Sequence, residues 1–259
     1  MLSALSVLLQ VATPASAQPL PTLTEVQFTE CLDLARKDAP SAVTEASLWT
    51  QQKGGYLAKA CHGFALASDF KFDLAIPVLT EAAQGAEENK DPRAGRFWAQ
   101  AGNAAIANEQ PTEALTALDK ALPLAMANAE KADVEVDRAR ALVALGRSDE
   151  AAIALTSARQ TGPENGTAWL LSATLARRLN KLADALSYIQ TTASLLPRDA
   201  AVALEAGNVA IAAGDEAAAR KQWEQTIAIA PTSRQANSAQ AQLAALSAKP
   251  TPPANPQSR

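Results

Sequence analysis

The chain has 259 residues, of which 48% are hydrophobic but only 4% aromatic, so alanine supplies much of its apolar content. Alanine is the best helix former and lets helices pack closely, which favours an all-helical protein over a sheet protein. The formal net charge of −4, with no basic stripe or long run of like charges, excludes nucleic acid as the main partner and excludes a polybasic membrane patch.

Residues 1–17 have the pattern of a secretory signal peptide. A short apolar core is followed by Pro14 and then by Ala15-Ser16-Ala17, the small-x-small pattern that signal peptidase requires, so we expect cleavage after Ala17. The segment is too short for a stable membrane span. No Lys or Arg precedes its apolar core, which leaves the true start codon open, and a buried N-terminal helix is the alternative.

The sequence contains two cysteines, Cys31 and Cys61. An even number of cysteines in an exported protein favours a disulfide, provided that the first and third helices pack side by side. Two buried free thiols in neighbouring helices are the alternative. We therefore name Cys31 and Cys61 as a candidate disulfide.

Residues 18–55 are predicted to form an N-terminal helical hairpin. The first helix covers residues 24–37, with Phe28 and Cys31 on one apolar face at helical spacing. Pro40 suits the first turn of the second helix, whose apolar stripe includes Trp49 and which Gly54-Gly55 ends.

Small residues and prolines recur at a constant interval in the second half of the chain. The three series are Pro163, Pro197 and Pro231; Gly146, Asn180 and Gly214; and Ala151, Ala185 and Ala219. A constant interval of about 34 residues indicates stacked helix–turn–helix units. Alanine allows the two helices of a unit to cross closely, glycine or asparagine supplies the positive φ that ends the first helix, and proline stops the second.

This pattern resembles the tetratricopeptide repeat family over residues 56–233. The predicted units are 56–89, 95–128, 132–165, 166–199 and 200–233. The resemblance implies an all-α, right-handed superhelical α-solenoid of about five helix–turn–helix units, behind the N-terminal hairpin and closed by a capping helix at 234–248. Residues 249–259 are proline-rich and polar and are predicted to be a disordered tail.

The first two units depart from this constant interval. The step from Ala75 to Ala114 and the step from Ala114 to Ala151 are both longer than the step from Ala151 to Ala185. We expect the extra residues to form looser turns around residues 87–91 and 126–130. Pro77 falls inside a predicted helix, where it favours a kink.

Motifs for catalysis or cofactor binding are scarce in this sequence. The one histidine, His62, is adjacent to Cys61, and neighbouring residues on a helix point in different directions, so a Cys–His dyad is poorly formed. Metal binding would need further Cys or His ligands. No phosphate-binding loop, dinucleotide turn or nucleophile elbow appears. We therefore predict no enzyme activity, no metal and no cofactor.

In the tetratricopeptide family the first helix of each unit lines a concave groove. Carried over to this sequence, the candidate peptide-groove residues are Phe64, Arg96, Asn103, Asp133, Arg140, Thr174, Arg177 and Asn208. Asparagine at the ninth position of a unit can pair with a peptide backbone of any sequence. A solvated helix face is the alternative for each residue.

The sequence therefore predicts a non-catalytic scaffold that holds a peptide or a partner helix in its groove. Its further resemblance, to exported repeat proteins of Gram-negative bacteria, implies a periplasmic location and a role in cell-envelope assembly. Two alternatives remain, a thiol–disulfide protein that uses Cys31 and Cys61 and a self-associating spacer. The sequence leaves the partner's identity and the oligomeric state open.

Overall fold

The computed structural model describes residues 22–248, and this part of the chain forms thirteen α-helices without a strand. The predicted signal peptide at 1–17 and the predicted tail at 249–259 lie outside the described residues. The helices are α1 Leu23–Lys37, α2 Ala39–Gln51, α3 Gly55–Ser68, α4 Phe72–Glu88, α5 Ala94–Ala107, α6 Pro111–Leu124, α7 Asn128–Ala144, α8 Ser148–Thr161, α9 Gly166–Arg178, α10 Leu182–Leu195, α11 Ala200–Ala212, α12 Glu216–Ile229 and α13 Arg234–Ser247. No helix within residues 22–248 has the length and apolar character that crossing a membrane requires.

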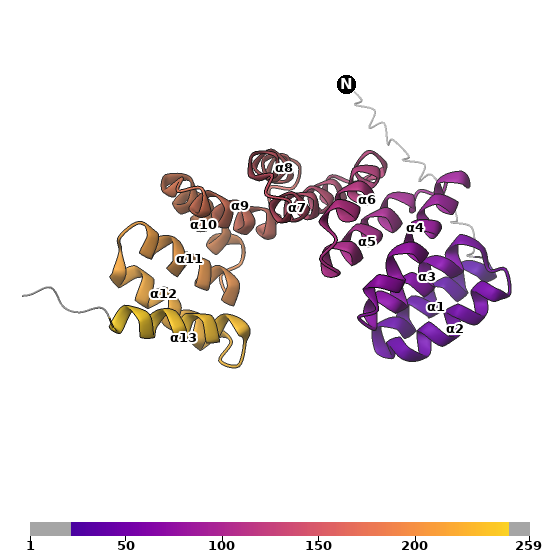
Figure 1. The fold of residues 1–259 in the computed structure, drawn as a ribbon, viewed down its shortest axis with the longest axis horizontal. Helices are drawn as coiled ribbons and strands as arrows, with labels where there is room; N and C mark the ends of the chain where they lie inside the picture. Colours follow the sequence, from indigo (N-terminus) through magenta and orange to yellow (C-terminus); the bar gives the residue numbers. More distant parts are fainter. Residues whose placement is uncertain (1–21, 249–259) are drawn as a thin grey trace, which may run out of the picture.

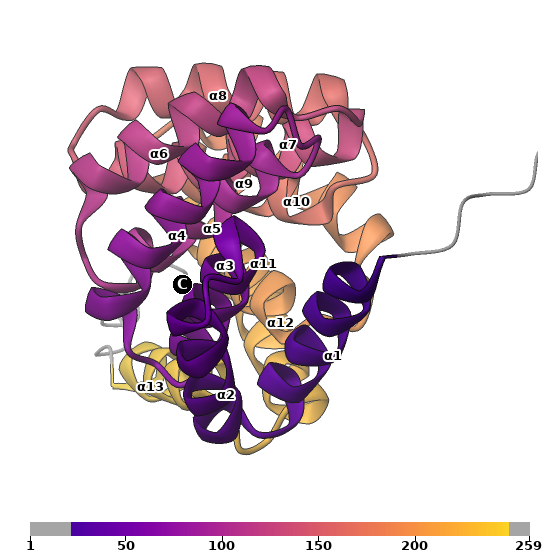
Figure 2. The same ribbon diagram turned by 90° about the vertical axis from the view of Figure 1, so that its right-hand side faces the viewer.

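The helices stack as consecutive hairpins into a curved α-solenoid. Figure 1 shows an arch with α1–α3 at one end and α11–α13 at the other. Each odd-numbered helix from α3 to α11 contacts the next odd-numbered helix, which brings these helices together along the inner face of the curve. In the end view of Figure 2, α6 and α8 lie at the rim, whereas α5 and α11 lie nearer the centre. The odd-numbered helices therefore form the concave face.

Small residues allow the two helices of each unit to cross closely. The alanine at the twentieth position is fully buried in all five units, namely at Ala75, Ala114, Ala151, Ala185 and Ala219. At the eighth position of the second unit, a Cβ added to Gly102 would lie 2.6 Å from Cγ of Leu118. A larger side chain there would push the helices apart, since real interiors are close-packed.

The turn inside each unit has a residue with positive φ at the same place. Gly146, Asn180 and Gly214 have φ values of 73°, 57° and 86°, as the periodic pattern predicted. In the first two units this conformation falls on Phe70 and Glu109, with φ of 59° and 57°. These two residues carry a side chain in a backbone region that favours glycine, so the irregular units keep the turn but lack the residue that suits it.

The extra residues of the first half lie mainly in helices, although the turn at 89–93 is also longer than the later turns at 162–165 and 196–199. Both α4 and α7 have 17 residues, whereas the other helices of the units have 13 or 14, so most of the extra residues lengthen helices. Glu87 and Glu88 belong to α4, because they continue a run of good helix formers. Glu130 belongs to α7, where its carboxylate accepts hydrogen bonds from the N–H groups of Met126 and Ala127. Helix α4 runs on through Pro77.

The N-terminal hairpin is joined to the repeats by a disulfide. Cys31 of α1 and Cys61 of α3 are bonded, with their Cα atoms 6.2 Å apart, a usual separation for a disulfide. Both side chains are buried, and Cys61 completely so. Neither sulfur is placed to exchange with a partner thiol, which favours a structural role for the bond.

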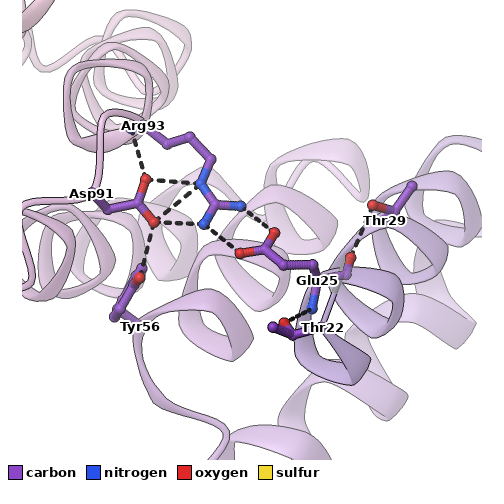
Figure 3. A network of polar contacts seen from close by, with 6 residues as sticks. All are labelled: Thr22, Glu25, Thr29, Tyr56, Asp91 and Arg93. Carbon is purple, nitrogen blue, oxygen red and sulfur yellow. Dashed lines mark hydrogen bonds and ion pairs between the residues drawn. The ribbon is translucent and has the colours of Figure 1, made fainter. Parts of the chain in front are cut away.

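A polar network also ties α1 to the turn between α4 and α5 (Figure 3). The Arg93 guanidinium donates to both carboxylate oxygens of Glu25 at 2.7 and 2.9 Å, and Arg93 Nε donates to Asp91 at 2.9 Å. The Tyr56 hydroxyl donates to the same Asp91 carboxylate at 2.9 Å. The hydrogen bonds that Asp91 itself accepts, above all those from Arg93, lower its pKa to about 2. Arg93 also lies over the ring of Phe28.

A candidate peptide site on the concave face

A hollow of about 390 Å³ lies on the concave face where α5, α7 and α9 meet. Its lining mixes small apolar residues with polar and charged side chains, which are Arg96, Gln100, Asn103, Glu130, Asp133, Asp137, Arg140 and Thr167. The groups come from the first helices of three successive units, so curvature of the stack brings them together. We call this the concave hollow.

One side of the concave hollow is closed by an ion pair between α5 and α7. Arg96 Nε donates to the Glu130 carboxylate at 2.7 Å, and a second guanidinium nitrogen also contacts it. These bonds hold the pKa of Glu130 below its usual value. Glu130 is positioned by its hydrogen bonds to the start of α7, so the Arg96 side chain is held across the gap while most of it remains exposed.

The floor of the concave hollow holds a buried carboxylate. Asp137 is only 8% exposed, and burial raises its pKa even though Arg140 and Asn103 stabilise its charge. Arg140 donates to Asp137 at 2.6 Å, and its side chain is 45% exposed. Asp137 therefore fixes the direction of Arg140 and Asn103 and leaves part of the guanidinium facing the solvent.

Asp133 stands at the exposed rim of the concave hollow. Its carboxylate accepts a hydrogen bond from Asn165 at 2.8 Å. Within residues 22–248, no lysine or arginine forms an ion pair with it. The hollow thus has two arginines, both paired, against three carboxylates, one of which is uncompensated.

A second, smaller pocket of about 180 Å³ adjoins the first between α7 and α9. It is mainly apolar, with Val143, Leu155, Leu171 and Leu175 in its wall. Arg140 lines both cavities and so marks the border between them. We call this the aliphatic pocket.

The structure gathers five of the eight predicted groove residues around these two cavities. Arg96, Asn103, Asp133 and Arg140 line the concave hollow, and Thr174 lines the aliphatic pocket. They come from three helices that are distant in the sequence, α5, α7 and α9. Five predicted groove residues from the second to fourth units therefore form one surface.

Arg177 and Asn208 lie apart from that surface. Arg177 Nε donates to Glu205 at 2.7 Å, which links α9 to α11. The Asn208 amide donates to Glu205 and accepts from the Trp223 indole at 3.2 Å. Both groups of Asn208 are therefore used within the fold, unlike the free amide that the sequence suggested for pairing with a peptide backbone.

Phe64 does not contribute to the concave hollow. It packs beside the apolar cluster of Ala35, Ala42 and Ala65, with Arg36 5.9 Å from its ring centre. The N-terminal hairpin covers this part of the first unit. The family's groove positions, carried over from the repeat alone, take no account of the hairpin that precedes the repeats.

Sequence reasoning missed the carboxylates that orient the arginines. Asp137 and Glu205 occupy the sixth position of their units and are 8% and 7% exposed. Each pairs with an arginine on the inner face, Arg140 or Arg177. An acid at the sixth position in two units out of five was the signal available in the sequence.

Alternative chemistry finds little support within residues 22–248. His62 is half-buried, and burial lowers its pKa. Its neighbour Cys61 is held in the disulfide, so it offers no thiol nucleophile. No group of three or more His, Cys, Asp or Glu side chains in the described part of the chain could hold a metal ion.

The family comparison matches the regular half of the chain. Residues 136–239 match the tetratricopeptide repeat model, in two overlapping stretches, 136–193 and 170–239. The matched stretches begin in α7 and contain part of the lining of the concave hollow and the whole lining of the aliphatic pocket. No curated protein matches the sequence.

Several solved structures share the fold over most of this chain. YrrB, a tetratricopeptide protein with an unusual peptide-binding site, is 22% identical with a TM-score of 0.53, over 77% of this chain and 98% of its own. PilF from Pseudomonas aeruginosa is 16% identical with a TM-score of 0.65, over 85% and 99%. The quorum sensor NprR from B. thuringiensis is 13% identical with a TM-score of 0.68, over 86% and 69%. Similarity at this level of identity shows the fold alone.

Proposed function

We propose that this protein is a non-catalytic scaffold that binds an extended peptide segment of a partner protein across the concave hollow. The observation that carries the proposal is the convergence of Arg96, Asn103, Asp133 and Arg140 from α5 and α7 on one cavity that α9 completes. Guanidinium and amide groups that are already oriented lose little entropy when they bind a peptide backbone. YrrB, which has a similar fold, is described as having a peptide-binding site.

The cavity is the right kind of site for an extended chain. It is open along the inner face, and it is continuous with the aliphatic pocket through Arg140. An extended peptide advances about 3.3 Å per residue, so a segment of several residues can contact both cavities. Peptide recognition of this kind combines polar contacts to the backbone with a few anchoring side chains.

We further propose that the protein works after export, in the periplasm, where such a scaffold would serve in assembly or maintenance of the cell envelope. The signal-peptide pattern of residues 1–17 supports export. The disulfide between Cys31 and Cys61 supports it independently, because stable disulfides belong to oxidising compartments. Fractionation of cells that express the tagged full-length chain tests this location, and a cytoplasmic, fully reduced chain would contradict it.

Blocking the concave hollow tests the binding function. Gln100 is exposed and lines the hollow, so Gln100→Trp would fill the space without removing an ion pair. We expect peptides selected from a random 12-residue phage library on the native protein to bind this variant at least tenfold more weakly, measured by fluorescence anisotropy. Tenfold corresponds to about 1.4 kcal/mol.

A matched control separates filling of the hollow from the effect of an added tryptophan. Gln190 is exposed on α10, outside both cavities, and Gln190→Trp should leave the affinities unchanged. Circular dichroism would verify that both variants remain helical. Equal binding by the native protein and Gln100→Trp would rule out the concave hollow as the peptide site.

A further inference from the structure

The concave hollow carries an imbalance of charge that its own residues do not resolve. Arg96 is paired with Glu130, and Arg140 is paired with Asp137. Asp133 has only the neutral amide of Asn165 as a partner among the described residues, and it is exposed to the cavity side of α7. A bound segment can therefore gain a charge-assisted hydrogen bond at Asp133 without breaking an existing ion pair.

The neighbouring carboxylates favour a cationic group at this place. Asp137 and Glu130 line the same cavity as Asp133, so an added negative charge would face three carboxylates. The two arginines are already drawn toward Asp137 and Glu130, which weakens their attraction for a further anion. Charge complementarity of this kind sets specificity more than affinity.

The aliphatic pocket supplies a second requirement. Its wall of Val143, Leu171 and Leu175 offers no group to pair with a polar side chain, while Arg140 and Arg178 stand at its edge. Burial of a leucine-sized side chain there is favourable, whereas burial of an unpaired polar group is costly. The border residue Arg140 places this pocket directly beside the acidic rim.

We propose that the concave hollow and the aliphatic pocket together select a partner segment in which a lysine or arginine lies near an aliphatic residue. The cation binds at Asp133, and the aliphatic side chain enters the aliphatic pocket. This inference rests on the proposed function and defines the chemistry of the partner. The bound segment is extended and spans the concave hollow and the aliphatic pocket. Acidic segments are rejected by the three carboxylates of the concave hollow.

An array of synthetic peptides tests the inference directly. The probes are 12-residue Gly/Ser peptides in which one position holds Arg, Ala or Glu and another, two to four residues away on either side, holds Leu or Ser. We expect the Arg–Leu peptides to bind the full chain at least tenfold more tightly than the Glu–Leu, Ala–Leu and Arg–Ser peptides. Tighter binding of the Glu–Leu peptides would overturn the inference.

Two variants, Asp133→Lys and Thr174→Phe, and one control assign the preference to individual side chains. Asp133→Lys should reverse the preference from Arg–Leu to Glu–Leu peptides, because it exchanges the sign of the one unpaired charge. Glu45→Lys, an exposed site on α2 remote from the groove, makes the same change of net charge and should leave the preference intact. Thr174→Phe, in the aliphatic pocket, should remove the advantage of Leu over Ser. An unchanged preference in Asp133→Lys would overturn the role of Asp133.

The failure of this inference is distinguishable from failure of the proposed function. If the array shows another preference and Gln100→Trp abolishes that binding, the concave hollow binds peptides but does not select a cation. If Gln100→Trp has no effect on any bound peptide, the proposed function itself is wrong. If no probe binds, while phage-selected peptides bind the hollow, the selectivity for a cation and an aliphatic side chain is again excluded.

Discussion

The two ends of this solenoid are stabilised in different ways. In the C-terminal region, α9, α11, α12 and α13 each begin with a side chain that accepts a backbone N–H, from Asn165, Asp199, Asp215 and Ser233. In the N-terminal region, α1 and α2 have such caps, from Thr22 and Asp38, whereas α3 to α6 have none. They are accompanied instead by the Cys31–Cys61 disulfide and the Arg93 network. The first two repeat units thus lack side-chain caps and depend on contacts with the hairpin, whereas caps are frequent in the last units.

The concave hollow lies where these two kinds of region meet. It draws on α5 from the irregular half and on α7 and α9 from the regular half. In a solenoid each unit contacts only its neighbours, so the two halves influence each other's stability only through the interface between them. The position of Arg96 relative to Asp133 therefore depends on how α5 and α7 pack together where the two halves meet. Substitutions confined to one half should reveal how limited this influence is.

Loss of the disulfide is expected to have the largest effect, confined to the N-terminal end. Replacing both cysteines, Cys31→Ser with Cys61→Ser, removes the cross-link between α1 and α3. On the chain-entropy model this lowers the free energy of unfolding of the hairpin by about 3–4 kcal/mol. Amide hydrogen exchange followed by mass spectrometry should show faster exchange in α1, α2 and α3.

The same measurement contains its own control. Exchange in α11–α13 should be unchanged, because these helices share no contact with the hairpin. Uniformly faster exchange along the chain would show that the solenoid unfolds as one unit. Unchanged exchange in α1 would show that the Arg93 network alone suffices to hold the hairpin.

Removal of the Arg93 side chain is expected to have an intermediate effect that depends on pH. Arg93→Gln leaves the buried Asp91 carboxylate without its main partner, which we expect to cost about 1–3 kcal/mol at neutral pH. In the native protein the pKa of Asp91 is about 2, below its ordinary value of 3.8. Stability from this group is therefore present above pH 4 and lost as the pH falls from about 4 to 2.

Denaturation at several pH values checks this expectation. The difference in stability between the native protein and Arg93→Gln should be largest above pH 4 and should shrink toward pH 2. A matched control is Arg36→Gln, since the Arg36–Asp33 pair lies on an exposed part of α1. Exposed pairs contribute little, so this control should have an effect under about 1 kcal/mol. An equal loss in both variants would argue against a special role for the Arg93 network.

Most of the fold could be predicted because it is encoded locally. Alanine, positive-φ glycine and proline recur at fixed positions. Glycine and proline act through their own backbone, and alanine acts within one unit by letting its two helices cross closely. The structure shows this at Ala185, which is fully buried, and at Gly214, whose φ is 86°. The lengthened α4 and α7 were missed because an insertion can enter a turn or a helix. Whether the extra residues form a turn or a helix depends on hydrogen bonds such as the one that Glu130 accepts at the start of α7.

The candidate site was only partly predictable, because it depends on pairing between units. The family's groove positions placed Arg96 and Arg140 on the inner face, where the structure has them. They could not show that Asn208 is used by Trp223 and Glu205, or that the hairpin covers Phe64. Such pairings join residues whose separation the repeat does not fix.

Exchange of single turn residues is expected to have the smallest effect, with opposite signs in the two halves. Glu109 is exposed with φ of 57°, so Glu109→Gly should relieve backbone strain in the second unit and stabilise it by about 0.5–1 kcal/mol. Gly214 has φ of 86°, and no atom lies within 4 Å of the place that an added Cβ would occupy. Gly214→Ala therefore causes no clash and should destabilise the fifth unit by a similar amount through backbone strain alone.

Hydrogen exchange would locate these two small effects, the first in α5–α6 and the second in α11–α12. If Glu109→Gly stabilises its unit while Gly214→Ala destabilises its own, the irregular half departs from the repeat at a measurable cost in stability. The disulfide and the Arg93 network would offset that cost. Destabilisation by Glu109→Gly would instead mean that the Glu109 side chain makes a favourable contribution larger than the strain it carries. The irregular turns would then be as well suited to their sequence as the regular ones, and the cross-links would have to stabilise the hairpin for another reason.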